Sequence, residues 1–336
     1  MLSRSKFLIT LIVVLLFTTI LFGVTFAEQL RFAHTDPPGG TREEAALFFA
    51  EKVEEYTEGR YTVKTFPSAI LGNDVKLLEL VSIGGVDFVV SGPVIYGKHV
   101  DAMSLMICPY LVDSFEQGWH LYDDSNWVRT RFEELESKGF KMLATWEAGF
   151  RCLTTRMPVK KPSDVKGIKL RVPPNPIHLT IWETFGANPV SMGIKEVYMA
   201  IQQGVVDGQE NPIPTIWANK FYEVAKYVTI TNHNYGPIPL SCSMKTWQKF
   251  SAKDQQAIMK AAKEASAYSR KLVTEQQDQM IKDMEEAGAI IYRPNLTEWY
   301  NAVLPAYEKF KEDYGEELIG SLMKDAQEIK NKYPTK

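Results

Sequence analysis

Arg171 is the side chain whose setting in this sequence is best suited to binding an anion. It lies in residues 167–174, where apolar residues alternate with Lys169 and Arg171 until Pro173 and Pro174 end the run. A period of two is typical of a half-buried strand. The planar guanidinium of an arginine on a rigid strand can donate two parallel hydrogen bonds to a carboxylate. The pattern alone leaves open the alternative of a solvated surface arginine.

Two tryptophans near this run in the sequence are candidates for the wall of a binding site. Trp146 precedes the run and Trp217 follows it. Binding sites are mostly apolar surfaces that carry a few polar groups. We therefore expect Trp146 and Trp217 to cover the apolar part of a ligand, with a place in the hydrophobic core as the alternative. Trp182 and Phe185 occur at helical spacing and are expected in the core.

Motifs on both sides of Arg171 carry a family resemblance. Residues 146–151 read Trp-Glu-Ala-Gly-Phe-Arg, and residues 207–212 read Asp-Gly-Gln-Glu-Asn-Pro. Shorter matches are Phe-Pro-Ser at 66–68, Leu-Gly at 71–72 and Asn-Lys-Phe-Tyr-Glu-Val at 219–224. Together they resemble the substrate-binding proteins of tripartite ATP-independent periplasmic (TRAP) transporters, of the dicarboxylate-binding type. The resemblance extends over nearly the whole chain after residue 27.

This resemblance implies a ligand, a site and a partner. Arg171 would pair with the carboxylate of an organic acid, and Arg151 and Asn211 would add donors in the same cleft. Sialic-acid-binding members carry an acidic residue just after the third strand, where this chain has Ser91 and Gly92, so a smaller organic acid is favoured. It could be a monocarboxylate, dicarboxylate, keto acid or sugar acid. The protein would act as a monomer without a cofactor and deliver the acid to membrane permease subunits driven by an ion gradient.

The family's fold gives the expected domain organisation. It is an α/β fold of the periplasmic-binding-protein type with two lobes, each a mainly parallel sheet wrapped by helices, and a long helix that braces both. We expect the first lobe to comprise residues 28–148 and 237–270. The second lobe would comprise residues 149–236 and 271–320, and residues 321–336 would form a C-terminal tail. A mature chain of about 300 residues is also at the size where two domains are the default.

Residues 1–27 differ from the rest of the chain. Arg4 and Lys6 precede an apolar run over residues 7–22, and Ala27 ends a Thr-Phe-Ala tripeptide. This arrangement predicts a secretory signal peptide, cleavage before Glu28 and a periplasmic protein without a stable membrane anchor. An uncleaved anchor is the alternative, although the run is short for a membrane span of about 20 residues.

Charge and cysteine content exclude some classes of partner and fold. The chain has a net charge of −3, which becomes −5 without residues 1–27 because these hold two basic residues and no acidic one. That balance argues against nucleic acid or an anionic membrane as the main partner. Three widely spaced cysteines, Cys108, Cys152 and Cys242, do not form a disulfide framework and are interpreted as small buried hydrophobic residues.

The order of the elements independently indicates parallel sheets wrapped by helices. Strands are predicted at 30–34, 61–66, 86–90, 140–146, 152–155 and 168–172, and helices at 73–83, 177–185, 195–203 and from a capping box at 41–44. Ligands bind at the carboxyl ends of parallel strands. Two of these ends carry His34-Thr35-Asp36 and Ser91-Gly92-Pro93, which are therefore expected to line the cleft, with His34 and Ser91 as candidate ligand contacts. Solvated loop residues are the alternative.

Residues 251–287 predict one long helix. They contain neither glycine nor proline, begin with a Ser251 cap and end at Gly288. At 1.5 Å per residue such a helix is roughly 55 Å long, more than the width of one lobe. Two helices with an unmarked break are the alternative.

Motifs for catalysis or metal binding are absent from the sequence. The five histidines never occur at metal-ligand spacing, and there is no phosphate-binding glycine loop and no Gly-x-Ser-x-Gly nucleophile motif. An exported enzyme and a sensory receptor for a signalling partner remain the two alternatives to a transport receptor. Substrate turnover would identify the first, and a neighbouring gene for a sensor kinase would identify the second.

Overall fold

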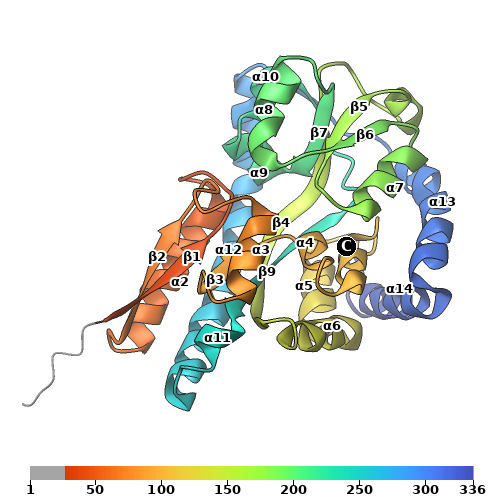
Figure 1. Ribbon diagram of the computed structural model, residues 1–336. Helices are drawn as coiled ribbons and strands as arrows, with labels where there is room; N and C mark the ends of the chain where they lie inside the picture. Colours follow the sequence, from red (N-terminus) through yellow and green to blue (C-terminus); the bar gives the residue numbers. More distant parts are fainter. Residues whose placement is uncertain (1–26, 336) are drawn as a thin grey trace, which may run out of the picture.

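The computed structural model describes residues 27–335, and these form two lobes joined by shared strands and a long helix (Figure 1). The signal peptide predicted at residues 1–27 therefore lies, except for Ala27, outside the described residues. The strands are paired in the order β2-β1-β3-β9-β4-β7-β5-β6, and β8 joins β4 to β10.

The first lobe contains the sheet that begins at the N-terminus. β1 pairs in parallel with β2 and with β3, whereas β9 is antiparallel to both β3 and the first half of β4. These strands span Glu28–Ala33 (β1), Tyr61–Phe66 (β2), Phe88–Val90 (β3), Phe140–Thr155 (β4) and Tyr235–Ser243 (β9). The parallel arrangement of β1 to β3 agrees with the strand–helix alternation in the sequence.

The second lobe is built on the other half of β4. β7 is antiparallel to that half, β5 is parallel to β7 and to β6, and β10 is parallel to β8. The strands span Lys169–Val172 (β5), Asn188–Ser191 (β6), Gly208–Pro212 (β7), Tyr227–Thr229 (β8) and Ile290–Tyr292 (β10). The strands predicted separately at 140–146 and 152–155 are thus one strand of 16 residues.

Helices cover both sheets. In and around the first lobe they are α2 (Thr41–Tyr56), α3 (Asp74–Ser82), α4 (Pro93–Tyr96), the 3₁₀ helix η1 (Asp101–Ile107), α5 (Phe115–Asp124), α6 (Asn126–Glu136) and α11 (Met244–Trp247). Those that follow β4, apart from α11 and the long helix α12 (Ala252–Glu286), are the 3₁₀ helix η2 (Pro162–Val165), α7 (Pro176–Thr184), α8 (Ile194–Gln202), α9 (Ile213–Ala218), α10 (Phe221–Val224), α13 (Leu296–Tyr314) and α14 (Glu316–Lys332).

Helix α12 (Ala252–Glu286) is the long helix predicted from the sequence. It is a single helix of 35 residues, and the hydroxyl of Ser251 caps it by accepting a hydrogen bond from the Asp254 N–H. It packs against α2 and β4 and then against α9 and β10, so it contacts both lobes. The alternative of two shorter helices is excluded.

Two details of the prediction are wrong. The capping box at 41–44 does not form, because Thr41 is already the first helical residue of α2 and Gly40 occupies the cap position without a side-chain bond. Most of the expected tail at 321–336 belongs to α14, which buries Leu322 and Ala326 and packs against α5 and α6. The apolar spacing on α14 gives it a core-facing side that a tail would lack.

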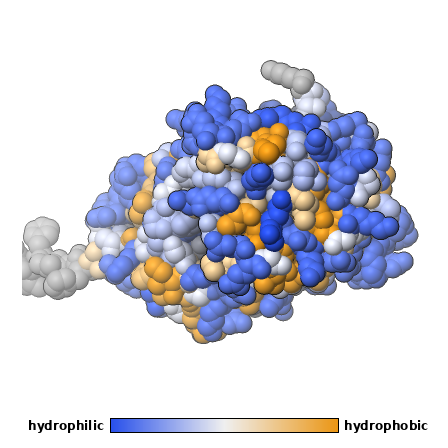
Figure 2. Space-filling model, turned by 90° about the horizontal axis from the view of Figure 1, so that it is seen from above, coloured by the Kyte–Doolittle hydropathy of each residue, from blue (hydrophilic) through white to orange (hydrophobic). Residues whose placement is uncertain are grey.

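The hydrophobic core accounts for several residues singled out in the sequence. Trp182 and Phe185 are buried in it, as predicted. Cys108, Cys152 and Cys242 are also buried, and none of the three forms a disulfide. Apolar residues on the face in Figure 2 are interspersed with hydrophilic ones. Within residues 27–335, no helix has the length and apolar character needed to cross a bilayer.

Candidate ligand-binding site

The main candidate site is a cavity of about 870 Å³, including the space at its mouth, between the two lobes. The carboxyl ends of β1, β3 and β5 meet there, as expected for parallel sheets. Its polar lining includes Thr35, Arg42 and Asp74 from the first lobe and Arg151, Arg171, His178 and Asn211 from β4 and the second lobe. Its apolar lining is aliphatic or proline, with no Phe, Tyr or Trp among the described lining residues.

The Arg171 guanidinium is fixed by hydrogen bonds on one edge, and its terminal edge remains free for a ligand. The side chain is 2% exposed, which excludes the solvated alternative. Its Nε and Nη2 donate to the Met192 carbonyl oxygen at 3.0 and 2.8 Å. No described residue accepts a hydrogen bond from Nη1, so Nη1 and the second hydrogen of Nη2 form a free two-point donor. Burial lowers the pKa of Arg171 to about 10, partly offset by the charge of Glu210, so the guanidinium stays protonated at neutral pH.

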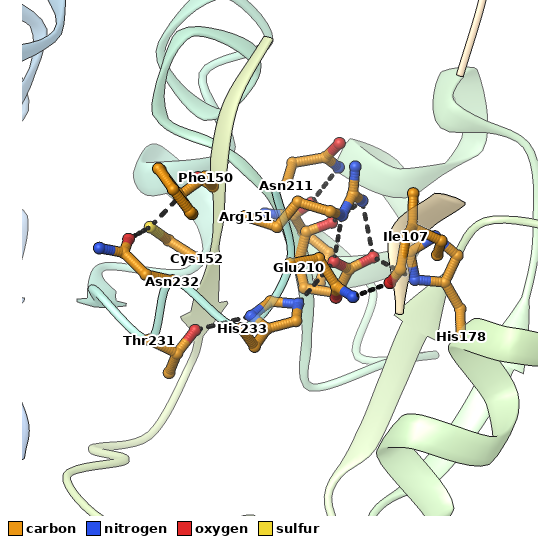
Figure 3. A network of polar contacts seen from close by, with 12 residues as sticks. Ile107, Phe150, Arg151, Cys152, His178, Glu210, Asn211, Thr231, Asn232 and His233 are labelled. Carbon is orange, nitrogen blue, oxygen red and sulfur yellow. Dashed lines mark hydrogen bonds and ion pairs between the residues drawn. The ribbon is translucent and has the colours of Figure 1, made fainter. Parts of the chain in front are cut away.

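Arg151 has fewer donors available to a ligand than Arg171, because Glu210 accepts hydrogen bonds from two of its three guanidinium nitrogens (Figure 3). Its Nε and Nη2 bond to the Glu210 carboxylate at 2.5 and 2.6 Å, and Nη2 also bonds to the Glu210 carbonyl oxygen at 2.7 Å. Only Nη1 lacks a partner among the described residues. Glu210 is fully buried, and although burial opposes its charge, Arg151 and the nearby histidines hold the pKa of this carboxyl well below its usual value. Arg151 and Glu210 are therefore an internally neutral pair.

Two histidines complete the surroundings of Glu210. His233 Nε2 lies 3.0 Å from Glu210 Oε2, and its Nδ1 lies 2.8 Å from the hydroxyl of Thr231. His178 Nδ1 lies 3.6 Å from Glu210 Oε1 and, although buried, has no hydrogen-bond partner among the described residues. Burial lowers the pKa of His178 to about 3 and also lowers that of His233, so both rings are neutral at pH 7.

Asn211 lines the same wall with one amide hydrogen already used. Its Nδ2 donates to the Gln209 side-chain oxygen at 2.5 Å, and Gln209 in turn bonds to the Thr154 hydroxyl. Residues 209 and 211 are two apart on β7 and so share a face. This chain of bonds fixes the amide plane of Asn211 and leaves its oxygen and one N–H for a ligand.

Asp74 gives the opposite wall a negative charge, which the sequence reasoning did not anticipate. It is the first residue of α3, and its Oδ1 accepts hydrogen bonds from Ser91 at 3.0 Å and Thr35 at 3.4 Å. Arg42 is paired with Asp36 at 3.2 Å. Arg42 and Arg151 each form an ion pair. The lining residues whose charge is not paired are therefore Arg171 on one wall and Asp74 on the other. The only sequence signal for Asp74 was its place beside the Leu-Gly motif at 71–72.

Four of the candidate contacts predicted from the sequence do not line the cavity: His34, Ser91, Trp146 and Trp217. His34 lies 2.5 Å from the Glu43 carboxylate and does not line the cavity, whereas the next residue, Thr35, does. The Ser91 side chain supports Asp74, and the next residue, Gly92, lines the wall.

Neither tryptophan lines the cavity: Trp146 is buried in the first-lobe core, and Trp217 is partly buried against the second-lobe core. Trp146 is 1% exposed and packs 5.7 Å from the Phe32 ring. Trp217 packs against the second-lobe core, since it lies two positions beyond Thr215, on another side of α9. The expected aromatic cover is therefore replaced by aliphatic walls.

The strands that join the lobes meet beside this cavity. The pairing of β4 with β9 is irregular between Glu147 and Phe150, where Gly149 has a φ of +99°. A Cβ on Gly236 of β9 would lie 2.6 Å from the Gly149 carbonyl oxygen, so the strands approach closely only because position 236 is glycine. Both features weaken regular pairing where the lobes join.

A buried carboxyl group lies at this junction. Glu147 accepts hydrogen bonds from the Gly149 N–H at 2.7 Å, from the Trp119 indole at 2.8 Å and from the Tyr235 hydroxyl. Burial raises the pKa of Glu147 to about 7, although these donors and the nearby charge of Arg270 oppose the rise. The group connects α5, β4 and β9.

The chain is similar to known proteins over most of its length. Residues 32–313 match the family described as "Bacterial extracellular solute-binding protein, family 7". The 2,3-diketo-L-gulonate-binding periplasmic protein of Escherichia coli (strain K12) is 36% identical over 265 residues, 78% of this chain and 80% of that protein. Among solved structures, the sugar acid binding protein from Advenella mimigardefordensis in complex with galactonate is 28% identical with a TM-score of 0.87, covering 90% of this chain and 99% of the other.

A further similar structure holds a different acid. The TRAP periplasmic solute binding protein from Sulfurospirillum deleyianum with bound succinate is 28% identical with a TM-score of 0.82, and the match covers 88% of this chain and 98% of the other.

Within residues 27–335 of the present chain, no group of three or more His, Cys, Asp or Glu side chains could hold a metal ion.

Proposed function

Since the chain belongs to the family 7 bacterial extracellular solute-binding proteins, the solute receptors of TRAP transporters, we propose that its interlobe cavity captures a hydroxylated monocarboxylic acid of the sugar-acid class. The receptor then delivers this acid to membrane permease subunits. The periplasm is the proposed compartment, with residues 1–27 as the cleaved signal. We assign no enzymatic activity to it.

The free terminal edge of Arg171 carries this proposal. It is a two-point donor that is charged at neutral pH, almost completely buried and held in orientation by the Met192 carbonyl oxygen. A carboxylate matches such a fork in both shape and charge. Arg151 Nη1, Asn211 and the neutral ring of His178 line the same wall and are proposed as supporting contacts.

Asp74 supports the choice of a hydroxylated monoanion over a dicarboxylate. With one carboxylate at Arg171, the distal end of the ligand faces the first-lobe wall, where Asp74 can accept hydrogen bonds from hydroxyl groups but repels a second carboxylate. The aliphatic walls suit the C–H surface of an open-chain or pyranose acid. The proposed ligands are aldonic, uronic or keto sugar acids.

Movement of the lobes is part of the proposed function. We place the lobes at 28–148 with 237–270 and at 149–236 with 271–320, with the strand crossings near Ala148 and Tyr235 as hinges. Both crossings coincide with the irregular part of the β4–β9 pairing. Because Arg171 is almost completely buried, the ligand needs the lobes to part before it enters and to close afterwards.

The proposal is tested by calorimetry with a panel of D-galactonate, D-erythronate, D-galacturonate and succinate, with galactitol as the matched compound that lacks a carboxylate. We expect at least one hydroxylated monocarboxylate to bind, succinate to bind more weakly and galactitol not to bind. Asp74→Asn should improve the affinity for succinate relative to the sugar acids by about tenfold, because it removes a like charge. A parent protein that prefers succinate would contradict the assigned ligand class, and equal binding of galactitol would contradict carboxylate recognition.

A further inference from the structure

Lys195 is placed where a lysine is unfavourable for its own helix. It is the second residue of α8, and the N-terminal end of a helix carries partial positive charge that repels a cation. The first turn also holds Glu196, the kind of residue that this end favours. The position of Lys195 therefore has no explanation within α8, which directs attention to the contact that its side chain makes.

That contact crosses from one lobe to the other. Lys195 Nζ donates a hydrogen bond of 2.7 Å to the carbonyl oxygen of Ala69, 126 residues earlier in the chain. Ala69 lies in the segment between β2 and α3 of the first lobe, whereas α8 lies between β6 and β7 of the second. The two atoms can meet only when the lobes are together, because no strand or helix links them locally.

The acceptor is held rigidly in place. Ser68 and Ala69 both have left-handed backbone conformations, with φ of +57° and +49°. Their N–H groups donate to the carbonyl oxygens of Asp36 at 2.8 Å and His34 at 3.1 Å, which ties the segment to the end of β1. Two consecutive non-glycine residues in this region require support from their surroundings. The Ala69 carbonyl therefore has a fixed direction before Lys195 reaches it.

The contact lies at the edge of the cavity and not inside it. Gly193 and Ile194 line the cavity from the second lobe, and Asn73 and Asp74 line it from the first, but neither Lys195 nor Ala69 does so. A cation at this edge is close to the path of an anionic ligand without occupying the ligand's place.

We propose that Lys195 and the Ala69 carbonyl form a latch that holds the lobes closed over the ligand. This inference rests on the proposed function, since a latch needs a bound solute to retain. The hydrogen bond exists in the closed arrangement and is replaced by water when the lobes part, so it stabilises only the closed state. Lys195 is thus a positioning residue that sets the lifetime of the complex without touching the ligand.

The test compares Lys195→Met with Lys195→Arg and with Lys169→Met as the matched control. Lys169 is an exposed lysine on β5 of the same lobe, and its side chain makes no hydrogen bond to a described residue. The ligand is whichever of galactonate, erythronate, galacturonate and succinate binds the parent protein best. Stopped-flow tryptophan fluorescence measures association and release at two salt concentrations, and thermal unfolding without ligand reports on the fold.

We expect Lys195→Met to release the ligand about three- to tenfold faster, a range appropriate to one partly solvated, charge-assisted hydrogen bond. Its association rate should be unchanged and its melting temperature without ligand not lowered, because the substitution removes a cation from a helix N-terminus. Lys195→Arg should restore slow release, and Lys169→Met should match the parent.

Three results would overturn the latch. One is equal release from Lys195→Met and the parent. A second is a change confined to association that disappears at high salt, which would make Lys195 an attractor of the anion. The third is the same acceleration in Lys169→Met. If no panel acid binds the parent, the proposed function fails first and the latch fails with it, so the two failures are distinguishable.

Discussion

Replacing Arg171 with alanine is the most direct test of the carboxylate site. The change removes the two terminal donors that face the cavity and leaves the ligand's carboxylate in a closed site without a counterion. Truncating one partner of a buried charge pair costs about 2 to 5 kcal/mol, or roughly 30-fold to several thousand-fold in affinity. Arg171→Lys should also bind poorly, because one ammonium group cannot bond to the Met192 carbonyl and present a planar fork to the ligand.

The fold should tolerate the loss of Arg171, and the structure gives the reason. Burial lowers the pKa of Arg171 to about 10, which shows that closing the cleft without a ligand carries a desolvation cost at this side chain. Alanine removes that cost, while the Met192 carbonyl loses its two donors, a penalty of about 1 to 3 kcal/mol. The two effects oppose each other, so the melting temperature should change little.

Calorimetry on folded variants decides whether this reasoning holds. Circular dichroism and thermal unfolding without ligand provide the control for the fold, and Arg171→Gln provides a side chain that is polar and of moderate length but uncharged. An affinity of Arg171→Ala within a factor of two or three of the parent would move the carboxylate site elsewhere and undo the assignment of β5.

Two further predictions concern the buried carboxylates. Arg151→Ala should weaken ligand binding less than Arg171→Ala, since only Nη1 of Arg151 is available to a ligand. The same substitution should lower the free energy of unfolding, measured by denaturant titration, by about 3 to 5 kcal/mol, because Glu210 is left buried without its partner. A variant as stable as the parent would show that the histidines suffice for Glu210. The raised pKa of Glu147, from 4.5 to about 7, means that the folded state binds more protons than the unfolded state between these values, so the parent should lose up to about 3 kcal/mol of stability as pH rises from 4.5 to 7. Glu147→Gln should remove this loss, and parallel pH profiles for the parent and the variant would refute the assignment.

The sequence predicted the elements of the fold better than it predicted which side chains line the site. Strand and helix periodicity identified β1, β2, β5 and α12 to within a residue or two, because burial of one face imposes a repeat that can be read from a single chain. His34 and Ser91 lie just beyond β1 and β3, where this repeat no longer applies. β3 ends at Val90 as predicted and β1 ends one residue early, at Ala33. Of the loop residues expected to line the cleft, Thr35 and Gly92 do so, whereas His34 and Ser91 do not, because loop conformation beyond a strand follows no repeat.

Other parts of the site depend on contacts that no local pattern records. Glu210 lies within the Asp-Gly-Gln-Glu-Asn-Pro motif, but its pairing with Arg151 follows from the antiparallel register that brings Arg151 opposite Pro212. Asp74 reads in the sequence as an ordinary acidic residue at the start of a helix, and only the assembly of two lobes places it across from Arg171. Trp146 was expected in the wall because it is near Arg151 in the sequence, but its place on β4 turns it into the first-lobe core.

The charge arrangement also connects recognition with closure. Closing the empty cleft buries Arg171 as a cation that bonds to one carbonyl group, and Arg151 opposes the favourable effect of the Glu210 charge on it. Water solvates that cation when the lobes are apart, and its lowered pKa in the closed structure records the loss of this solvation. A ligand carboxylate supplies the missing negative charge at the free edge of Arg171. We therefore infer that the anion itself shifts the equilibrium towards closure, because it interacts favourably with Arg171 most strongly when the cleft is dry. A neutral sugar of the same size would lack this effect and leave the lobes apart.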